Sequence, residues 1–253
     1  MTSELKRSYL ITGAAKRIGR AVALNAAHEN ANRIVLHYRS SRQQVQELAD
    51  EITAMGVQTF PISADFENKD QTQNLLYEAW KSAGPIDVLI NNASFFSASR
   101  LTDFSIDGLW HDLMVNAFAP FLLSKAFFDL HKNKVSDKLP VIINFLDSRI
   151  TDYDREHVTY HLAKRMLFSL TRMMAIEFAP LVRVNAIAPG LILPPPGKNQ
   201  AYLEQLKNTN PLNAIGSLEQ ITDAVQFLVR SDFITGQVIF IDGGRNIKTG
   251  IYG

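Results

Sequence analysis

The fold of this chain is decided by the stretch Ser8-Tyr9-Leu10-Ile11-Thr12-Gly13-Ala14-Ala15-Lys16-Arg17-Ile18-Gly19. Its first part is a short apolar run that predicts a buried strand, and helical spacing of apolar residues begins at Ala21. A strand, a glycine turn and a helix in this order suit a phosphate site, because helix-start amides carry the positive end of the helix dipole. The spacing is Thr-Gly-x-x-x-Arg-x-Gly rather than Gly-x-Gly-x-x-Gly, so a plain tight turn remains an alternative here.

Strand and helix patterns alternate along the rest of the chain. After the first unit, strands are expected at Arg33–Tyr38, Gln58–Ser63, Val88–Ile90, Pro140–Phe145, Arg183–Ile187 and Gln237–Ile241. Helices are expected at Gln43–Met55, Asp70–Ala83, Leu109–Leu130, His157–Phe178 and Leu218–Val229. The pattern predicts an α/β fold with a doubly wound, seven-stranded parallel sheet, helices on both faces and a ligand crevice at the carboxyl ends of the strands.

Composition narrows the class of protein. The 253 residues predict one domain spanning residues 1–253, and 26 basic side chains nearly cancel 25 acidic ones, so no general attraction to nucleic acid or to an acidic membrane is expected. The absence of cysteine excludes disulfides, thiolate metal sites and a cysteine nucleophile, and no metal-ligand cluster is visible. No signal peptide or membrane span is expected. We therefore expect a cytoplasmic protein with a small-molecule partner.

The end of the second predicted strand bears on the cofactor. A dinucleotide fold selective for NAD usually places an acidic residue here, whereas a basic residue accommodates the extra phosphate of NADPH. This chain has His37, Tyr38, Arg39 and Ser40. The sequence therefore favours NADPH over NADH, with the alternative that Arg39 and Arg42 belong to a solvated loop and helix start.

Other strand ends carry further candidates. Asp65 is placed either to meet the adenine or to cap the next helix. Phe95 and Phe96 follow the fourth strand and form either one wall of a slot for a planar ring or ordinary packing.

The segment 191–217 is irregular and proline-rich, and we expect it to cover the substrate rather than to act as a proline-rich protein ligand.

A tyrosine and a lysine share one face of the helix predicted at 157–178. Because residues four apart lie side by side on a helix, Tyr160 and Lys164 can point into one cleft, close to Asp147 at the end of the fifth strand. A nearby ammonium favours the phenolate, so the sequence predicts that Lys164 lowers the pKa of Tyr160. Asn116 lies among apolar residues and needs partners, either a water or a backbone carbonyl near the reaction site.

Together these features resemble the short-chain dehydrogenase/reductase family over nearly the whole chain. The matching motifs are Thr12-Gly13 to Gly19, Asn91-Asn92-Ala93, Asn116, Tyr160 with Lys164, Arg183 to Gly190 and Asp242-Gly243-Gly244. The resemblance implies a Rossmann fold, a homotetramer, a tyrosine that acts as acid and base, and a lysine that holds the nicotinamide ribose.

Two departures from the family pattern resemble its pteridine reductase and dihydromonapterin reductase branch. Arg17 replaces the usual middle glycine, and Asp147 replaces the usual serine thirteen positions before the tyrosine. The resemblance implies an NADPH site made by Gly13, Arg17, Ile18, Gly19, His37, Tyr38, Arg39, Ser40, Asp65, Phe66, Asn92, Ala93, Ser94, Tyr160, Lys164, Pro189, Gly190 and Ile192. It implies a substrate site made by Arg17, Ser94, Phe96, Asp147, His157 and Tyr160. The catalytic set that it implies is Asp147, Tyr160, Lys164 and Asn116.

The expected reaction is hydride transfer from NADPH to a dihydropterin, with dihydrofolate as a further substrate. Reduction of a pterin C=N bond requires a proton on a ring nitrogen, which the pair formed by Asp147 and Tyr160 can supply. One alternative is a reductase of ketones or 3-oxoacyl thioesters, although Asp147 argues against it. Another is a non-catalytic NADPH-binding sensor.

Overall fold

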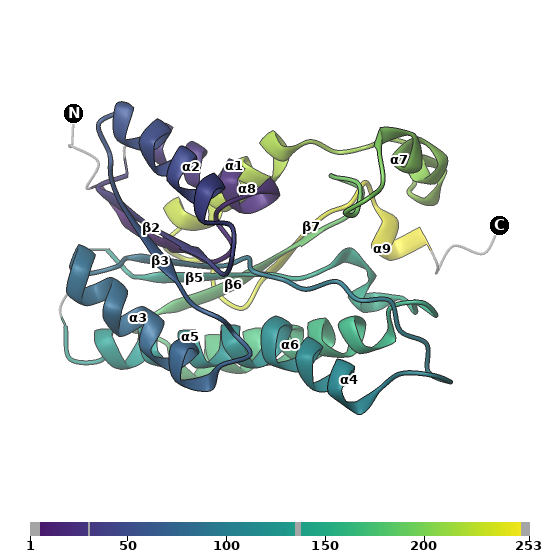
Figure 1. Cartoon of the computed structure of the whole chain (residues 1–253), viewed down its shortest axis with the longest axis horizontal. Coiled ribbons are helices and arrows are strands. Elements are labelled where there is room, and N and C mark those ends of the chain that lie inside the picture. Colours follow the sequence, from purple (N-terminus) through teal and green to yellow (C-terminus); the bar gives the residue numbers. More distant parts are fainter. Residues whose placement is uncertain (1–5, 30, 135–137, 249–253) are drawn as a thin grey trace.

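Seven parallel strands form a single sheet in the computed structural model, which describes residues 6–29, 31–134 and 138–248 (Figure 1). The strands are β1 (Ser8–Ile11), β2 (Arg33–Tyr38), β3 (Gln58–Ser63), β4 (Val88–Asn91), β5 (Val141–Phe145), β6 (Arg183–Pro189) and β7 (Val238–Ile241). Their spatial order is β3-β2-β1-β4-β5-β6-β7. The predicted fold class is thus confirmed, while the predicted domain of residues 1–253 extends beyond the described residues at both ends.

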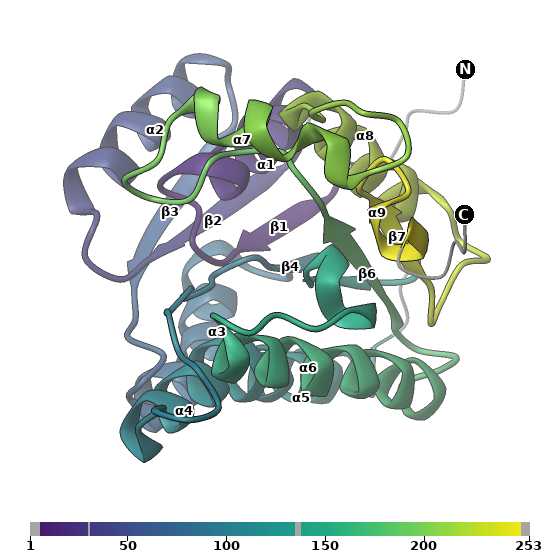
Figure 2. The same cartoon turned by 90° about the vertical axis from the view of Figure 1, so that its right-hand side faces the viewer.

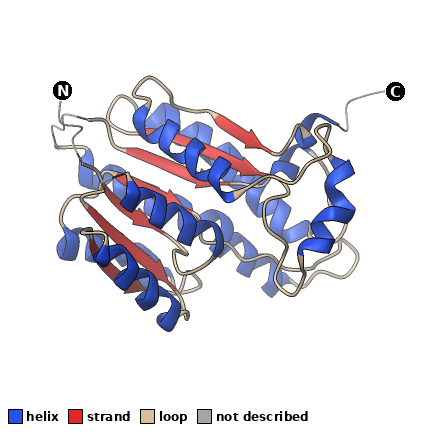
Figure 3. Ribbon diagram, turned by 90° about the horizontal axis from the view of Figure 1, so that it is seen from above, coloured by secondary structure: helices blue, strands red, loops and turns tan. Residues whose placement is uncertain are grey.

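Helices cover both faces of the sheet, as predicted (Figures 1 and 3). One layer holds α1 (Arg17–His28), α2 (Arg42–Ala54) and α8 (Leu218–Arg230), and the other holds α3 (Lys69–Ala83), α4 (Ile106–Leu113), α5 (Ala119–His131) and α6 (Val158–Glu177). Side chains alternate between the two faces along each strand. In β1, Tyr9 and Ile11 pack into the core beneath one layer, and Leu10 packs into the core beneath the other.

The strand order reverses between β1 and β4. The chain moves outward from β1 to β3 and then returns to the other side of β1, so the loops that follow β1 and β4 diverge and leave a crevice between them. Helices α7 (Gln200–Leu206) and α9 (Arg245–Lys248) lie at one end of the sheet (Figures 1 and 2). The segment 191–217 was expected to be irregular, but it contains α7 and the short 3₁₀ turn η3 (Lys207–Thr209).

The helix predicted at 109–130 is part of a longer helical run, Ile106–His131, in which a π-helical segment, η1 (Met114–Phe118), separates α4 from α5. By length and composition this run is long and apolar enough to cross a membrane, although the sequence analysis predicted no membrane span here. Half of its apolar window is buried in the protein, which is equally typical of a core helix. The π segment is centred on Asn116, and such segments are common at functional sites.

Candidate active site

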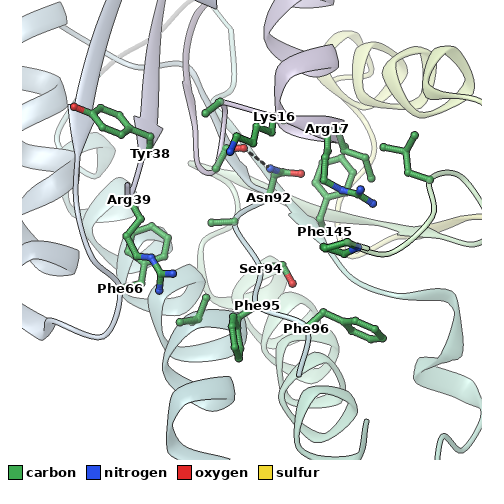
Figure 4. A pocket seen from close by; sticks show the side chains of 18 of the residues that line it. Lys16, Arg17, Tyr38, Arg39, Phe66, Asn92, Ser94, Phe95, Phe96 and Phe145 are labelled. Carbon is green, nitrogen blue, oxygen red and sulfur yellow. Dashed lines mark hydrogen bonds between the residues drawn. The ribbon is translucent and has the colours of Figure 1, made fainter. Parts of the chain in front are cut away.

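A cavity of about 740 Å³ lies at the point where the strand order reverses (Figure 4). Its volume is within the range of small-molecule sites. Every residue of the predicted cofactor site lines it. Of the predicted substrate and catalytic residues, only Asn116 and His157 are missing from its wall.

The glycine turn after β1 is held in shape by a buried histidine. Gly13 has a φ of +63°, which favours glycine, and its N–H donates to Nδ1 of His37 at 3.1 Å. Since Nδ1 accepts, Nε2 carries the proton and donates to the carbonyl oxygen of Ala64 at 3.0 Å. The ring stacks on Phe66 at 4.4 Å, and burial lowers the pKa of His37 to about 4. His37 is therefore a neutral residue that shapes the turn.

A threonine joins the two loops that flank the crevice. The Thr12 hydroxyl accepts from the N–H groups of Asn92 and Ala93, both at 2.9 Å, and donates to the carbonyl of Ile90 at 3.2 Å. The Asn92 amide in turn donates to the Thr12 carbonyl at 2.9 Å. These bonds fix the loop after β4 against the glycine turn.

Cationic and hydroxyl side chains gather where β2 ends. Arg39, Ser40 and Ser41 line the cavity here, and Lys16 lines the same cavity from the glycine turn. No ion pair joins Lys16 or Arg39 to a carboxylate within residues 6–29, 31–134 and 138–248. Figure 4 shows Tyr38 and Arg39 at one end of the cavity and Arg17, Phe145 and Phe96 at the other. The donors at the Arg39 end suit a phosphate group.

Asp65 lines the cavity after β3, and one of its two predicted roles is wrong. Helix α3 is capped by Asn68, whose side chain accepts from the N–H groups of Asp70 and Gln71. The Asp65 carboxylate instead accepts from the N–H of Glu67 at 3.1 Å in the loop before the helix. Its place on the cavity wall is compatible with the other prediction, contact with an adenine.

Arg17 links the glycine turn to the loop that follows β6. Its φ of +56° lies in the left-handed region, which costs a side-chain-bearing residue about 1 kcal/mol or more. Its guanidinium donates to the carbonyl of Pro194 at 2.8 Å. Because Pro194 belongs to the segment 191–217, this bond ties the predicted covering loop to the cavity rim.

Asp147, Tyr160 and Lys164 come together as predicted. The Tyr160 hydroxyl donates to one Asp147 carboxylate oxygen at 3.2 Å, and the backbone N–H of Arg149 donates to the other at 2.8 Å. The Lys164 ammonium donates to the carbonyl of Phe145 at 2.8 Å. Tyr160 and Lys164 are 6% and 2% exposed, so both side chains are almost fully buried although they line the cavity.

The predicted lowering of the Tyr160 pKa is wrong. Burial, followed by the charge and hydrogen bond of Asp147, raises the pKa of Tyr160 well above its ordinary value. The ammonium lies 5.8 Å from the centre of the Tyr160 ring, and burial lowers the pKa of Lys164 to about 8. A carboxylate bonded to a buried phenol opposes the phenolate more than a distant ammonium favours it. Tyr160 is therefore held protonated, as a proton donor must be.

Asn116 lies behind the cavity wall and binds the loop after β4. Its side-chain oxygen accepts from the Ser94 hydroxyl at 2.7 Å and from the Phe95 N–H at 3.2 Å, and its amide donates to the Phe95 carbonyl at 2.8 Å. Of the two partners that the sequence allowed, the structure has the backbone carbonyl. Asn116 is fully buried and sets the course of the Ser94–Phe95 backbone.

The two phenylalanines after β4 line the cavity and are not core residues. Phe95 and Phe96 are 39% and 42% exposed. Phe95 meets His111 edge-on at 4.1 Å. Phe96 stacks on His157 at 4.1 Å and meets Tyr160 edge-on at 4.8 Å, so His157 lies behind Phe96 rather than on the wall.

Sequence reasoning missed part of the wall, namely Ala15, Lys16, Ser41, Ala64, Val115, Phe145 and Leu146. Phe95 was a candidate for the slot, and Leu193, Pro195 and Pro196 belong to the segment expected to cover the substrate. Lys16 and Ser41 were detectable, because each adjoins a predicted residue of matching chemistry. The apolar residues carry no chemical signal in the sequence, since packed and cavity-lining side chains of this kind look alike.

Comparisons with known proteins agree with this geometry. The family model described as enoyl-(acyl carrier protein) reductase matches residues 13–246. Dihydromonapterin reductases of Shigella boydii serotype 4 (strain Sb227) and Escherichia coli (strain SMS-3-5 / SECEC) are each 30% identical to this chain over 242 residues, covering 94% of it and 96% of the relative.

Solved structures agree as well. FolM alternative dihydrofolate reductase 1 from Brucella canis, complexed with NADP, superposes with a TM-score of 0.88 at 28% identity, over 95% of this chain and 94% of that chain. The protein of the same name from Brucella suis, also with NADP, gives the same score and identity over 98% and 97%. The motifs, the cavity and these matches together place the chain in the short-chain dehydrogenase/reductase family, in its pteridine reductase-like branch.

Proposed function

We propose that this protein is an NADPH-dependent reductase that converts a dihydropterin of the dihydromonapterin or dihydrobiopterin type to its tetrahydro form, with dihydrofolate as a further substrate. The observation that carries the proposal is the hydrogen bond from Tyr160 to Asp147, at the position where most of the family has a serine. The dihydromonapterin reductases and the NADP-bound dihydrofolate reductase structures among the relatives support it.

The cavity residues suit NADPH. Arg39, Lys16, Ser40 and Ser41 would hold the 2′-phosphate, because these cations have no carboxylate ion-pair partner among the described residues and hydroxyls accompany them. The glycine turn would receive the pyrophosphate, and Lys164 would hold the nicotinamide ribose. When bound, NADPH supplies the hydride.

The chain itself supplies the proton. Tyr160 stays protonated at neutral pH, and its one hydroxyl proton lies in the hydrogen bond to Asp147. To protonate a substrate, the hydroxyl would turn that proton from Asp147 toward the cavity, which leaves a phenolate. A proton or a bound water at Asp147 can then restore the phenol. A serine at this position holds a carbonyl oxygen, whereas a carboxyl group can deliver a proton to a ring nitrogen.

The substrate end of the cavity suits a flat ring. Phe96 lines it with an aromatic ring, Arg17 lines it with a guanidinium donor, and the Ser94 hydroxyl, whose proton goes to Asn116, can accept a hydrogen bond there. The bond from Arg17 to Pro194 supports a covering role for the segment 191–217. His157 and Asn116 would act through Phe96 and Ser94 rather than by touching the substrate.

We also propose a homotetramer in the cytoplasm. An apolar stripe runs along the exposed side of α6, where Leu162, Met166, Met173 and Ile176 are 49%, 37%, 64% and 79% exposed. Apolar side chains grouped in this way are typical of surfaces that pair with another copy. The lack of cysteine is consistent with a reducing compartment.

The reaction is tested by following the loss of NADPH absorbance when the purified protein is mixed with dihydromonapterin, dihydrofolate or a simple ketoester. The proposal predicts turnover on dihydromonapterin, weaker turnover on dihydrofolate and none on the ketoester. Turnover on the ketoester alone would identify an ordinary carbonyl reductase. Tight NADPH binding without turnover on any of them would identify a non-catalytic binding protein.

A further inference from the structure

A buried carboxylate outside the cavity wall contacts three side chains from the loop before α6 and from the start of α6 itself. One oxygen of Asp154 lies 2.6 Å from a guanidinium nitrogen of Arg149, 3.1 Å from Nδ1 of His157 and 3.4 Å from Nε2 of His161. The other oxygen accepts from the N–H of Glu156 at 2.7 Å. The Asp154 side chain is only 8% exposed.

Two of these partners connect the carboxylate to the substrate end of the cavity. His157 stacks on Phe96, and Phe96 meets the Tyr160 ring edge-on. The backbone N–H of Arg149 holds one oxygen of Asp147, whose other oxygen accepts from Tyr160. The contacts thus form a closed cycle that includes three residues of the cavity wall, Phe96, Tyr160 and Asp147.

The backbone fixes the same two segments against each other. The N–H of Ser99 donates to the carbonyl of Glu156 at 2.7 Å, and the N–H of Val158 donates to the carbonyl of Ser99 at 3.1 Å. The loop that carries Phe96 is therefore paired with the loop that carries Asp154. The position of one loop depends on the other.

Asp154 stays ionised in this setting. Burial raises the pKa of its carboxyl group, but the Glu156 N–H, the His157 hydrogen bond and the Arg149 charge together lower it below its ordinary value. A charged acceptor binds a guanidinium and an imidazole more strongly than a neutral one. A neutral amide of the same shape would keep the volume and lose most of this attraction.

We propose that Asp154 is a positioning residue for the reaction, which holds the Phe96 ring through His157 and the Asp147–Tyr160 pair through Arg149. This inference rests on the proposed function. It predicts that Asp154 affects how the dihydropterin is bound and oriented, and not how NADPH is bound, because Asp154 has no contact with the Arg39 end of the cavity.

Steady-state kinetics of Asp154→Asn provide the first test. We expect KM for dihydromonapterin to rise about tenfold and kcat to fall by a smaller factor. The reason is that the charge-assisted contact between Asp154 and His157, which lies behind the Phe96 ring, is lost. KM for NADPH should stay within about twofold of the original value. Glu156→Gln is the matched control, because it removes a carboxylate of the same loop that is 65% exposed and whose ion pair among the described residues is with Arg100.

A double-mutant cycle tests the route through the aromatic ring. If Asp154 acts through Phe96, combining Asp154→Asn with Phe96→Leu should cost little more in kcat/KM than the larger single change. Fully additive losses, or an unchanged KM for the pterin in Asp154→Asn, would overturn the proposal. His157→Gln should likewise raise KM for dihydromonapterin and leave KM for NADPH nearly unchanged. It replaces Asp154→Asn in these experiments if Asp154→Asn does not fold.

The NMR shifts of the His157 ring protons give a readout that does not need turnover. Stacking on Phe96 should move them upfield, with His157→Gln identifying the signals, and Asp154→Asn should return them toward unstacked values. Unchanged shifts would overturn the positioning role. If the unaltered protein reduces no dihydropterin, the proposed function fails. The NMR shifts would still decide whether Asp154 holds the stacked rings of His157 and Phe96.

Discussion

His37 makes the stability of the protein depend on pH in a way that can be calculated. The ring is 2% exposed, and burial lowers its pKa from 6.5 to about 4. Above pH 6.5 the imidazole is neutral in both the folded and the unfolded chain, so its contribution is fully present. Between about pH 6.5 and about pH 4 the unfolded chain binds a proton that the folded chain does not, and stability is lost as the pH falls.

The size of this loss follows from the two pKa values. At about 1.4 kcal/mol per pH unit, the full loss is about 3 kcal/mol, and about 2 kcal/mol of it is reached by about pH 5. Protonation of His37 would also remove the acceptor for the Gly13 N–H, so the hydrogen bond in the glycine turn favours the neutral imidazole. The pH effect on His37 is therefore linked to the shape of the phosphate site.

The assay is urea unfolding, followed by tryptophan fluorescence, at about pH 7.5 and about pH 5. His37→Gln is the reference, because its amide can accept from Gly13 and donate to Ala64 but does not titrate. The free energy of unfolding of the unaltered protein should fall by about 2 kcal/mol more than that of the variant. His131 and His161 titrate equally in both proteins and cancel. An identical fall in both would refute the buried, neutral His37.

Three further changes test other parts of the site and the surface. Arg39→Ala should lower kcat/KM for NADPH about tenfold or more and leave that for NADH nearly unchanged, measured by initial rates; equal losses with both cofactors would contradict the phosphate role. Arg17→Gly should raise the free energy of unfolding by about 0.5–1 kcal/mol, because the left-handed backbone is relieved, and should raise KM for the pterin as the bond to Pro194 is lost. Met173→Glu combined with Ile176→Glu should dissociate the proposed tetramer in sedimentation experiments, and a tetramer that persists in the variant would place the interface elsewhere.

The architecture was predictable because its signals are local. The apolar run before Gly13 and the alternating strand and helix patterns predict a parallel sheet, and the rules for such sheets place the crevice between β1 and β4. Sequence order also brought Asp147, Tyr160 and Lys164 to one place, since two lie a helical turn apart and the third ends a neighbouring strand.

What the sequence did not reveal depends on distance and burial. The net shift of the Tyr160 pKa was predicted in the wrong direction, because helical spacing does not show that the phenol is buried, that a carboxylate meets it, or that the ammonium bonds the Phe145 carbonyl. The π segment around Asn116 is a one-residue change in helical period that an apolar pattern does not resolve.

Contacts between separate loops were also out of reach. His157 was predicted to touch the substrate, but it lies behind Phe96 because the loops after β4 and before α6 pair with each other. Asp154 was not singled out at all, since a lone aspartate in a polar loop has no sequence signature. Its role depends on burial and on three partners that only the fold brings together.

Asp147 and Tyr160 are proposed to deliver the proton to a dihydropterin together. The most direct measurement is single-turnover NADPH oxidation by Asp147→Ser with saturating dihydromonapterin, alongside the unaltered protein and a check of NADPH binding. We predict a rate lowered about a hundredfold or more with NADPH binding retained. A rate close to that of the unaltered protein would contradict the proton-delivery role and remove the reason for assigning a pterin rather than a carbonyl substrate.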